Sequence, residues 1–243
     1  MKKIFSILLF SICILSCHSQ PQVKTIVNDE NAEKRDIAAF TAIQVSSAIT
    51  VYLSQGNEDA VAVSCSDNTK ISKIITEVKN GVLKISLDND FWNSWRMGDL
   101  KVKAYISVKT LNSLKASGAS SIKINETING TNLKVEASGA SNIKGNLIFS
   151  TINVTASGAS SINFTGKTNE AVFDASGASS IKGFDFVTTN CKIEASGASN
   201  VNLTVNGSLV AEASGASSIK YAGNPTTTNV DATGASSIKK KMD

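Results

Sequence analysis

Apolar and polar residues alternate along much of the chain, and this period of two predicts strands rather than helices. Between residues 37 and 110 the strand-like stretches read FTAIQV, AITVYL, DAVAVSC, GVLKISL and LKVKAYISV. The segment NTKISKIITEVKNG between them fits either a short helix or another strand. Its last two residues, Asn80 and Gly81, are a turn signal that leads into a strand from Val82 to Leu87.

From Leu111 onward, a five-residue motif of small residues, Ala-Ser-Gly-Ala-Ser, recurs along the chain, and we call this motif the phrase. Near-copies begin at Ala116, Ala137, Ala156, Ala175, Ala195, Ala213 and Ala232, at spacings of 18 to 21 residues. A period of about 20 residues with one strand signal per copy is typical of a solenoid. Seven coils at about 4.8 Å each would make a body roughly 34 Å tall.

Alignment of the copies indicates which side chains face the interior. An apolar residue lies two positions before each initial Ala, and an Ile or Val lies six positions after it. The Ala and Gly of the phrase share this parity, which predicts one common interior for all of these positions. Gly118 and its counterparts are the expected corners, where a positive φ or a close backbone approach lets the coil pass near its own axis.

Polar and charged residues fall into three columns that we expect to face outward. The residues directly before each initial Ala form a mostly acidic column. The residues directly after each inward Ile or Val form a mostly basic column. The residues directly before each inward Ile or Val form a ladder of hydroxyl and amide groups. In order, the columns are Lys115, Glu136, Thr155, Asp174, Glu194, Glu212 and Asp231; Lys123, Lys144, Asn163, Lys182, Asn202, Lys220 and Lys239; and Ser121, Asn142, Ser161, Ser180, Asn200, Ser218 and Ser237.

The N-terminus reads as an export signal. Residues 1–16 combine a basic start with an apolar run that is too short to span a bilayer permanently, as in a secretory signal peptide. Leu15-Ser16-Cys17 resembles a bacterial lipobox, so we expect lipidation of Cys17, the alternative being an ordinary signal peptide with an incidental cysteine. Residues 17–36 then form a polar tether, residues 37–110 an N-terminal β region and residues 111–243 the solenoid.

The lipid on Cys17 makes the membrane an expected partner. His18 rather than Asp follows this cysteine, which favours sorting to the outer membrane, with the body in the periplasm or at the cell surface. The formal net charge of +4 includes Lys2 and Lys3 of the signal, which leaves about +2 after cleavage. Such a weak positive charge is not the footprint of a nucleic-acid-binding protein.

Few residues of this chain have the chemistry of a catalytic or metal site. Cys65 and Cys191 are in phase with inward residues and are predicted to be interior hydrophobes, although an oxidising compartment would permit a disulfide between them. The single histidine, His18, lies outside the expected folded body, and no P-loop, GxSxG, HExxH, EF-hand or Cys/His metal spacing occurs. We therefore predict no catalytic residue, no metal and no cofactor.

The segment DNDFWNSWRMGD, residues 88–99, differs in composition from the rest of the chain. It carries Phe91, Trp92, Trp95 and Arg96 between two strands. Trp and Arg are frequent at binding hot spots, and aromatic rings also stack on sugars. These four residues are candidate contacts to a glycan or an envelope protein; the alternative is that the aromatic residues plug the open end of the coil.

The stretches FTAIQVSSAITVYLSQGNEDAVAVSC, ITEVKNGVLKISL and LKVKAYISVKTLNSLKASGASSI together resemble a bacterial family of unknown function described as "putative auto-transporter adhesin, head GIN domain". The likeness runs from about Phe40 to the C-terminus. It implies an all-β, right-handed parallel β-helix-like fold in a secreted protein or lipoprotein, and it transfers no catalytic residues. We expect a non-enzymatic, lipid-anchored envelope protein that serves as a scaffold or adhesion module. An envelope enzyme acting on polysaccharide is the alternative.

Overall fold

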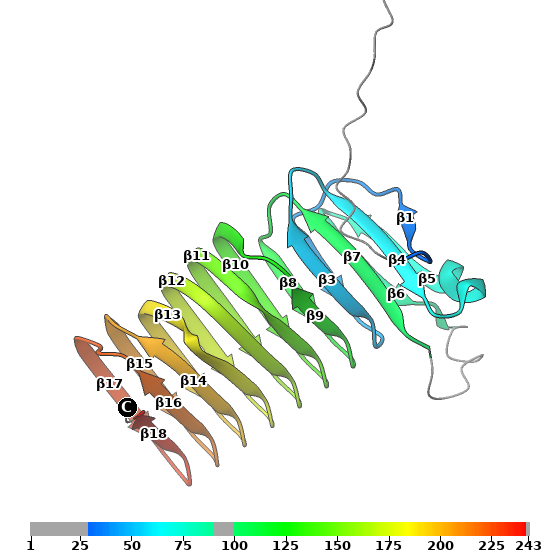
Figure 1. Ribbon diagram of the computed structural model, residues 1–243. Coiled ribbons are helices and arrows are strands. Elements are labelled where there is room, and N and C mark those ends of the chain that lie inside the picture. The colour runs from blue at the N-terminus through cyan, green and yellow to red at the C-terminus, as the bar shows by residue number, and fades with distance from the viewer. Residues whose placement is uncertain (1–28, 90–99, 242–243) are drawn as a thin grey trace, which may run out of the picture.

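The computed structural model describes residues 29–89 and 100–241 of the chain. They form an elongated body in which a β-solenoid of about seven coils, residues 113–240, follows a nearly closed mixed sheet (Figure 1). Hydrogen bonds join all of the described strands into a single sheet. The predicted all-β solenoid is therefore confirmed. None of the helical segments among the described residues has the length and hydropathy needed to cross a membrane.

The mixed sheet at the N-terminal end combines parallel and antiparallel pairs. Its outer strands are β1 (Glu33–Arg35), β4 (Ala60–Cys65), β5 (Ile74–Lys79), β6 (Val82–Leu87) and β7 (Val102–Val108). Strand β4 lies antiparallel to both β1 and β7, and β5 pairs with β6 as a hairpin. The predicted turn is confirmed, since Asn80 and Gly81 both have a positive φ, of 53° and 73°. The ambiguous segment before it contains a 3₁₀ helix, η1 (Asn68–Lys73), and then β5.

Two strands connect this sheet to the solenoid. Strand β2 (Ala42–Val45) lies between β6 and β8 (Ser113–Ala116), and β3 (Thr50–Gln55) lies between β7 and β9 (Ser121–Ile124). All four of these pairings are parallel. The turn from β2 to β3 therefore stacks on the first solenoid corner, and Ser47, with a φ of 69°, occupies the position that Gly118 takes in the next coil.

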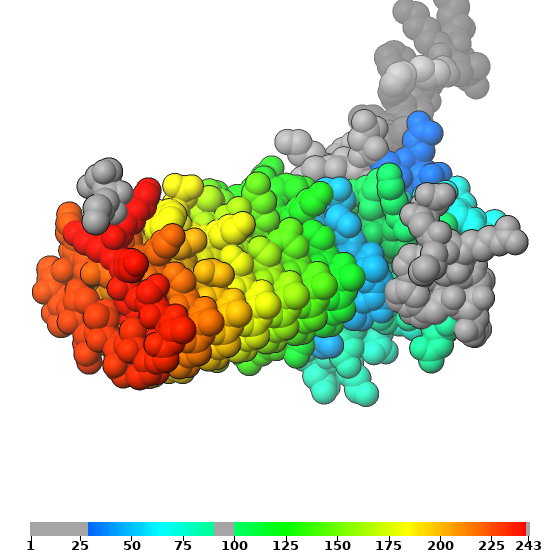
Figure 2. All heavy atoms as spheres, turned by 90° about the horizontal axis from the view of Figure 1, so that it is seen from below, coloured from blue at the N-terminus to red at the C-terminus, as the bar shows by residue number. Residues whose placement is uncertain are grey.

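The coils of the solenoid pair in parallel and nearly in register. Their strands are β10 (Ile128–Ala137), β11 (Asn142–Ala156), β12 (Ser161–Ala175), β13 (Ser180–Ala195), β14 (Asn200–Val205), β15 (Ser208–Ala213), β16 (Ser218–Ala222), β17 (Thr227–Ala232) and β18 (Ser237–Lys240). The initial Ala of each phrase pairs with the initial Ala of the next, as Ala156 does with Ala175. In the space-filling view the coils form successive bands from green to red (Figure 2).

The predicted aliphatic interior is confirmed. The residues two positions before each initial Ala, from Leu114 to Ala211, are at most 2% exposed. The residues six positions after each initial Ala, from Ile122 to Ile219, are at most 1% exposed. The rings of Phe164 and Phe173 lie 6.1 and 6.3 Å from that of Phe186. In the last coil Val230 is 45% exposed, because no further coil covers it.

The prediction that the corner glycines face the interior was wrong. From Gly118 onward they are exposed, with φ between 66° and 72°, and they approach the preceding coil rather than the axis. A Cβ on Gly177 would lie 2.8 Å from the carbonyl oxygen of Gly158, which accepts a hydrogen bond from the N–H of Ala178 at 2.8 Å. Glycine is thus required both by the left-handed backbone and by the coil beneath it.

In the first six phrases the final serine is buried instead. Ser120, Ser141, Ser160, Ser179, Ser199 and Ser217 are at most 2% exposed. From Ser141 on, each hydroxyl donates a hydrogen bond of 3.0 to 3.3 Å to the carbonyl oxygen of the initial Ala one coil earlier. These bonds satisfy a polar group that would otherwise be costly inside an apolar core.

Candidate functional site

The five site residues predicted from the sequence lie outside the described residues. They are the lipidation site Cys17 and the candidate contacts Phe91, Trp92, Trp95 and Arg96. Lipidation and the contact to a glycan or protein stay predictions. The candidate surfaces within residues 29–89 and 100–241 are a small cavity, a carboxylate cluster and two charged columns.

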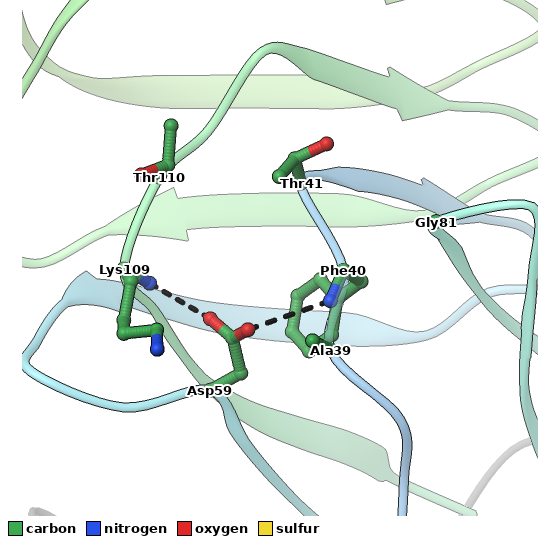
Figure 3. A pocket seen from close by; sticks show the side chains of 7 residues that line it. All are labelled: Ala39, Phe40, Thr41, Asp59, Gly81, Lys109 and Thr110. Atoms are coloured by element: carbon green, nitrogen blue, oxygen red, sulfur yellow. Dashed lines mark hydrogen bonds between the residues drawn. The ribbon is translucent and has the colours of Figure 1, made fainter.

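The cavity lies beside the N-terminal sheet and has a volume of about 240 Å³ (Figure 3). It is lined mainly by apolar atoms of Ala39, Phe40, Thr41, Asp59, Gly81, Lys109 and Thr110. Figure 3 shows the carboxylate of Asp59 between two backbone segments, where its oxygens accept hydrogen bonds from the N–H of Phe40 at 3.4 Å and of Lys109 at 2.9 Å. Both carboxylate oxygens thus hold the two backbone segments together. The volume of the cavity lies below the range of about 300 to 1,000 Å³ that is usual for small-molecule sites.

A carboxylate cluster joins the first described residue to the mixed sheet. One oxygen of Asp29 accepts hydrogen bonds from Tyr105 Oη at 2.7 Å, Ser64 Oγ at 2.8 Å and Lys103 Nζ at 3.2 Å. The hydrogen bond from Tyr105 is the largest cause that lowers the pKa of Asp29 to about 2, and partial desolvation opposes it. Asp29 is therefore ionised at neutral pH and fastens the chain to β4 and β7 rather than acting as a general acid.

The acidic column faces outward, as predicted. Asp174, Glu194, Glu212 and Asp231 are direct neighbours on four successive coils, beside a shallow hollow of about 200 Å³. Lys192 pairs with Glu194 at 2.7 Å. Among the described residues, no group of three or more His, Cys, Asp or Glu side chains is placed to hold a metal ion.

The two cysteines among the described residues are interior side chains. Cys65 and Cys191 are buried and free, which confirms their prediction as interior residues. Burial raises the pKa of Cys191 to about 12, so its thiol stays protonated and unreactive. The pKa of Glu136 is lowered by hydrogen bonds from Lys134 and Lys115, which is opposite to the shift that a general acid needs.

The basic column also faces outward, and the structure extends it at its N-terminal end. Strand pairing places Tyr105 beside Tyr52 and Tyr52 beside Lys123. We call the whole set the lysine row: Tyr105, Tyr52, Lys123, Lys144, Asn163, Lys182, Asn202, Lys220 and Lys239. Sequence reasoning missed the two tyrosines, because their place depends on the pairing of β3 with β7 and β9. The match of QVSSAITV to the repeat could have supplied that signal.

Comparisons with known proteins agree with this architecture. Residues 39–225 match the family described as "Putative auto-transporter adhesin, head GIN domain". A putative adhesin from Bacteroides fragilis has a similar structure, with a TM-score of 0.80, 21% identity, and coverage of 86% of this chain and 96% of that one. Putative adhesins from Parabacteroides distasonis (TM-score 0.67, 18% identity, coverage 86% and 96%) and Parabacteroides merdae (TM-score 0.60, 19% identity, coverage 87% and 95%) share the fold. No curated protein sequence matches significantly.

Proposed function

Because the chain belongs to the family "Putative auto-transporter adhesin, head GIN domain", we propose that it is a non-enzymatic binding module of the bacterial cell envelope, serving as a scaffold or adhesin. The main observation behind the proposal is that equivalent side chains on the outer face are in register from coil to coil. The ladder of hydroxyl and amide side chains continues in register across seven coils, and a row of Lys and Asn side chains runs beside it. Extended surfaces of this kind are how repeat solenoids recruit partners.

The chemistry of the described residues supports the non-enzymatic part of the proposal. The repeated serines donate to backbone carbonyls inside the core, so they are structural rather than nucleophilic. The acidic column places at most one carboxylate on each coil, and the carboxyl groups of Asp29, Asp67 and Glu136 have lowered pKa values. The general acid of a polysaccharide hydrolase needs a raised pKa, which is opposite to these shifts.

We further propose that a lipid on Cys17 anchors this module in the outer membrane. Acyl chains contribute about 0.8 kcal/mol per buried methylene, so several chains on one cysteine would hold the protein durably. Mass spectrometry of the mature N-terminus tests the anchor, and a thioether-linked lipid on Cys17 is the expected result. An unmodified N-terminus at Gln20 or beyond would refute it. Protease treatment of intact cells would then separate surface exposure from periplasmic residence.

Binding to isolated cell envelopes tests the function itself. The mature chain with Cys17→Ser, which removes the site of lipidation, should sediment with envelope fractions and saturate as the fractions are titrated. The same fractions analysed for new reducing ends or unsaturated sugars should show none, and their appearance would favour the enzyme alternative. Replacement of both Trp92 and Trp95 by Ala should weaken sedimentation without unfolding if these rings are contacts. Loss of the folded state instead would assign them to the fold.

A further inference from the structure

The lysine row presents unpaired charge along the length of the solenoid. Lys123, Lys144, Lys182, Lys220 and Lys239 are exposed. The ion pairs found in the described part of the chain involve none of these five side chains. Six steps of about 4.8 Å separate the first lysine from the last, so the charges extend over about 29 Å. Unpaired cations in single file present a linear electrostatic surface to an anionic partner.

In the middle of the row, charge and amide alternate. From Lys144 to Lys220 the order on successive coils is Lys144, Asn163, Lys182, Asn202 and Lys220. Neighbouring lysines in this stretch are therefore two coils, or about 9.6 Å, apart. A residue of an extended polysaccharide is about as long as the rise of one coil. The period of the charges thus matches a sugar chain with one anionic group on every second residue.

The surroundings of the row suit a sugar chain. The hydroxyl and amide ladder from Ser121 to Ser237 runs along one side of it in the same register. At the N-terminal end Tyr52 stacks on Tyr105 with ring centroids 5.3 Å apart, and Lys123 Nζ lies 5.3 Å from the Tyr52 ring centroid. Hydroxyl and amide groups beside fixed cations provide the hydrogen bonds that a charged glycan requires, and the stacked tyrosines end the row of charges.

We propose that the lysine row binds a linear anionic polysaccharide, laid along the solenoid axis, that carries one carboxylate or sulfate on every second sugar. The assignment rests on the proposed binding function and names its ligand class and its site. Lysines would contact the anionic sugars, and Asn163 and Asn202 would contact hydroxyl or amide groups of the sugars between them. The acidic column, on the other side of each corner, would repel the same polymer and confine it to this face.

Two other anionic surfaces fit the row less well. The acidic column of a second copy carries a carboxylate on four consecutive coils, whereas the row interrupts its charges with Asn163 and Asn202. An anionic membrane is a plane that would favour lysines spread over a broad face, yet the ladder beside the row is uncharged and the column across each corner is mostly acidic. The alternating single file favours a chain-like polymer.

Hyaluronan oligosaccharides are the probe, because they carry a carboxylate on alternate sugars. The mature chain with Cys17→Ser should bind them at low ionic strength in calorimetry, and neutral dextran should not bind. The combined variant Lys144→Gln, Lys182→Gln and Lys220→Gln should lose about 10-fold or more in affinity. The control Lys79→Gln, Lys109→Gln and Lys167→Gln removes the same charge elsewhere and should lose less than about 2-fold. Circular dichroism should show both variants folded.

A second variant tests the period. Asn163→Lys with Asn202→Lys makes the charges continuous and should shift the preference toward polygalacturonate, which has a carboxylate on each sugar. Equal losses in the row and control variants, or no shift with the added lysines, would overturn the assignment. So would row-dependent binding to phosphatidylglycerol vesicles or self-association without hyaluronan binding. If hyaluronan and polygalacturonate both fail while envelope fractions still bind, the row assignment is wrong and the proposed function stands.

Discussion

The N-terminal sheet and the solenoid belong to one hydrogen-bonded sheet but stabilise it differently. In the N-terminal part, strands far apart in the sequence are joined by individual polar side chains, as Asp29 joins β4 to β7 and Asp59 links two loops. In the solenoid, one set of bonds recurs on each coil, between the corner backbones and from the buried serines. The first part depends on single contacts, and the second depends on repetition.

This difference has a consequence for how each part tolerates substitution. A contact that occurs once can be removed completely by one mutation, but its neighbours are free to adjust around it. A repeated contact is one of many, yet its neighbours are copies of itself held at a fixed spacing, which leaves little room to relax. Steric changes should therefore cost most in the solenoid, and changes of charge should cost most in the N-terminal sheet.

The largest expected effect is at a solenoid corner. Gly177→Ala adds a Cβ at a φ of 68° and 2.8 Å from the carbonyl oxygen of Gly158, so we expect a loss of about 2 to 3 kcal/mol in the free energy of unfolding. Gly81→Ala is the matched control, because Gly81 has a φ of 73° with no atom within 4 Å of the added Cβ. It should cost about 1 kcal/mol, the backbone strain alone. Urea denaturation of the two variants measures the difference, and equal losses would contradict the role of the preceding coil.

The next effect is a pH dependence from Asp29. Its pKa is lowered from 3.8 to about 2, so its ionised form stabilises the fold above pH 4, and this contribution is lost as the pH falls from about 4 toward 2. Asp29→Asn should remove about 1 to 2 kcal/mol at pH 7 and flatten the acid limb of the stability profile. Thermal unfolding between pH 2 and pH 7 measures it.

Tyr105→Phe provides the matched control for that titration. It deletes the hydrogen bond that contributes most to the pKa shift but keeps the ring that stacks on Tyr52. The variant should show an acid transition moved to higher pH, with the carboxylate still held by Ser64 and Lys103. An acid profile identical to that of the wild type in both variants would remove Asp29 from the account of acid stability.

The contrast also explains what the sequence could predict. The interior columns from Leu114 and Ile122 were predictable because alternation and repetition both specify them. The position of the glycines was not, because the alternation of strand residues does not continue through a corner: Ala116 is buried, Gly118 is exposed and Ser120 is buried again. The corner projects outward between Ala116 and Ser120, which both face inward and are an even number of residues apart.

The single contacts of the N-terminal part were even harder to predict from the sequence. The cluster around Asp29 unites three distant strands or loops, and no local pattern marks its members. Ser47 escaped detection as a corner because Ser replaced the Gly that defines the phrase, although its φ of 69° is that of the other corners. The basic column of the lysine row was visible in the sequence, but its tyrosine end depends on the pairing of β3 with β7 and β9.

The smallest effect tests the repeated polar bond. Ser179 is 1% exposed and its hydroxyl donates to the carbonyl oxygen of Ala156 at 3.1 Å. Ser179→Ala should cost only about 0.5 to 1 kcal/mol, because that carbonyl still accepts the N–H of Ser176 at 2.9 Å and no buried polar group is left unpaired. Ser180→Ala, on the outward ladder, is the control and should change stability by less than about 0.5 kcal/mol. A loss above about 2 kcal/mol for Ser179→Ala in urea denaturation would mean that the serine ladder acts cooperatively along the solenoid, and that its bonds cannot be treated as separate copies of one contact.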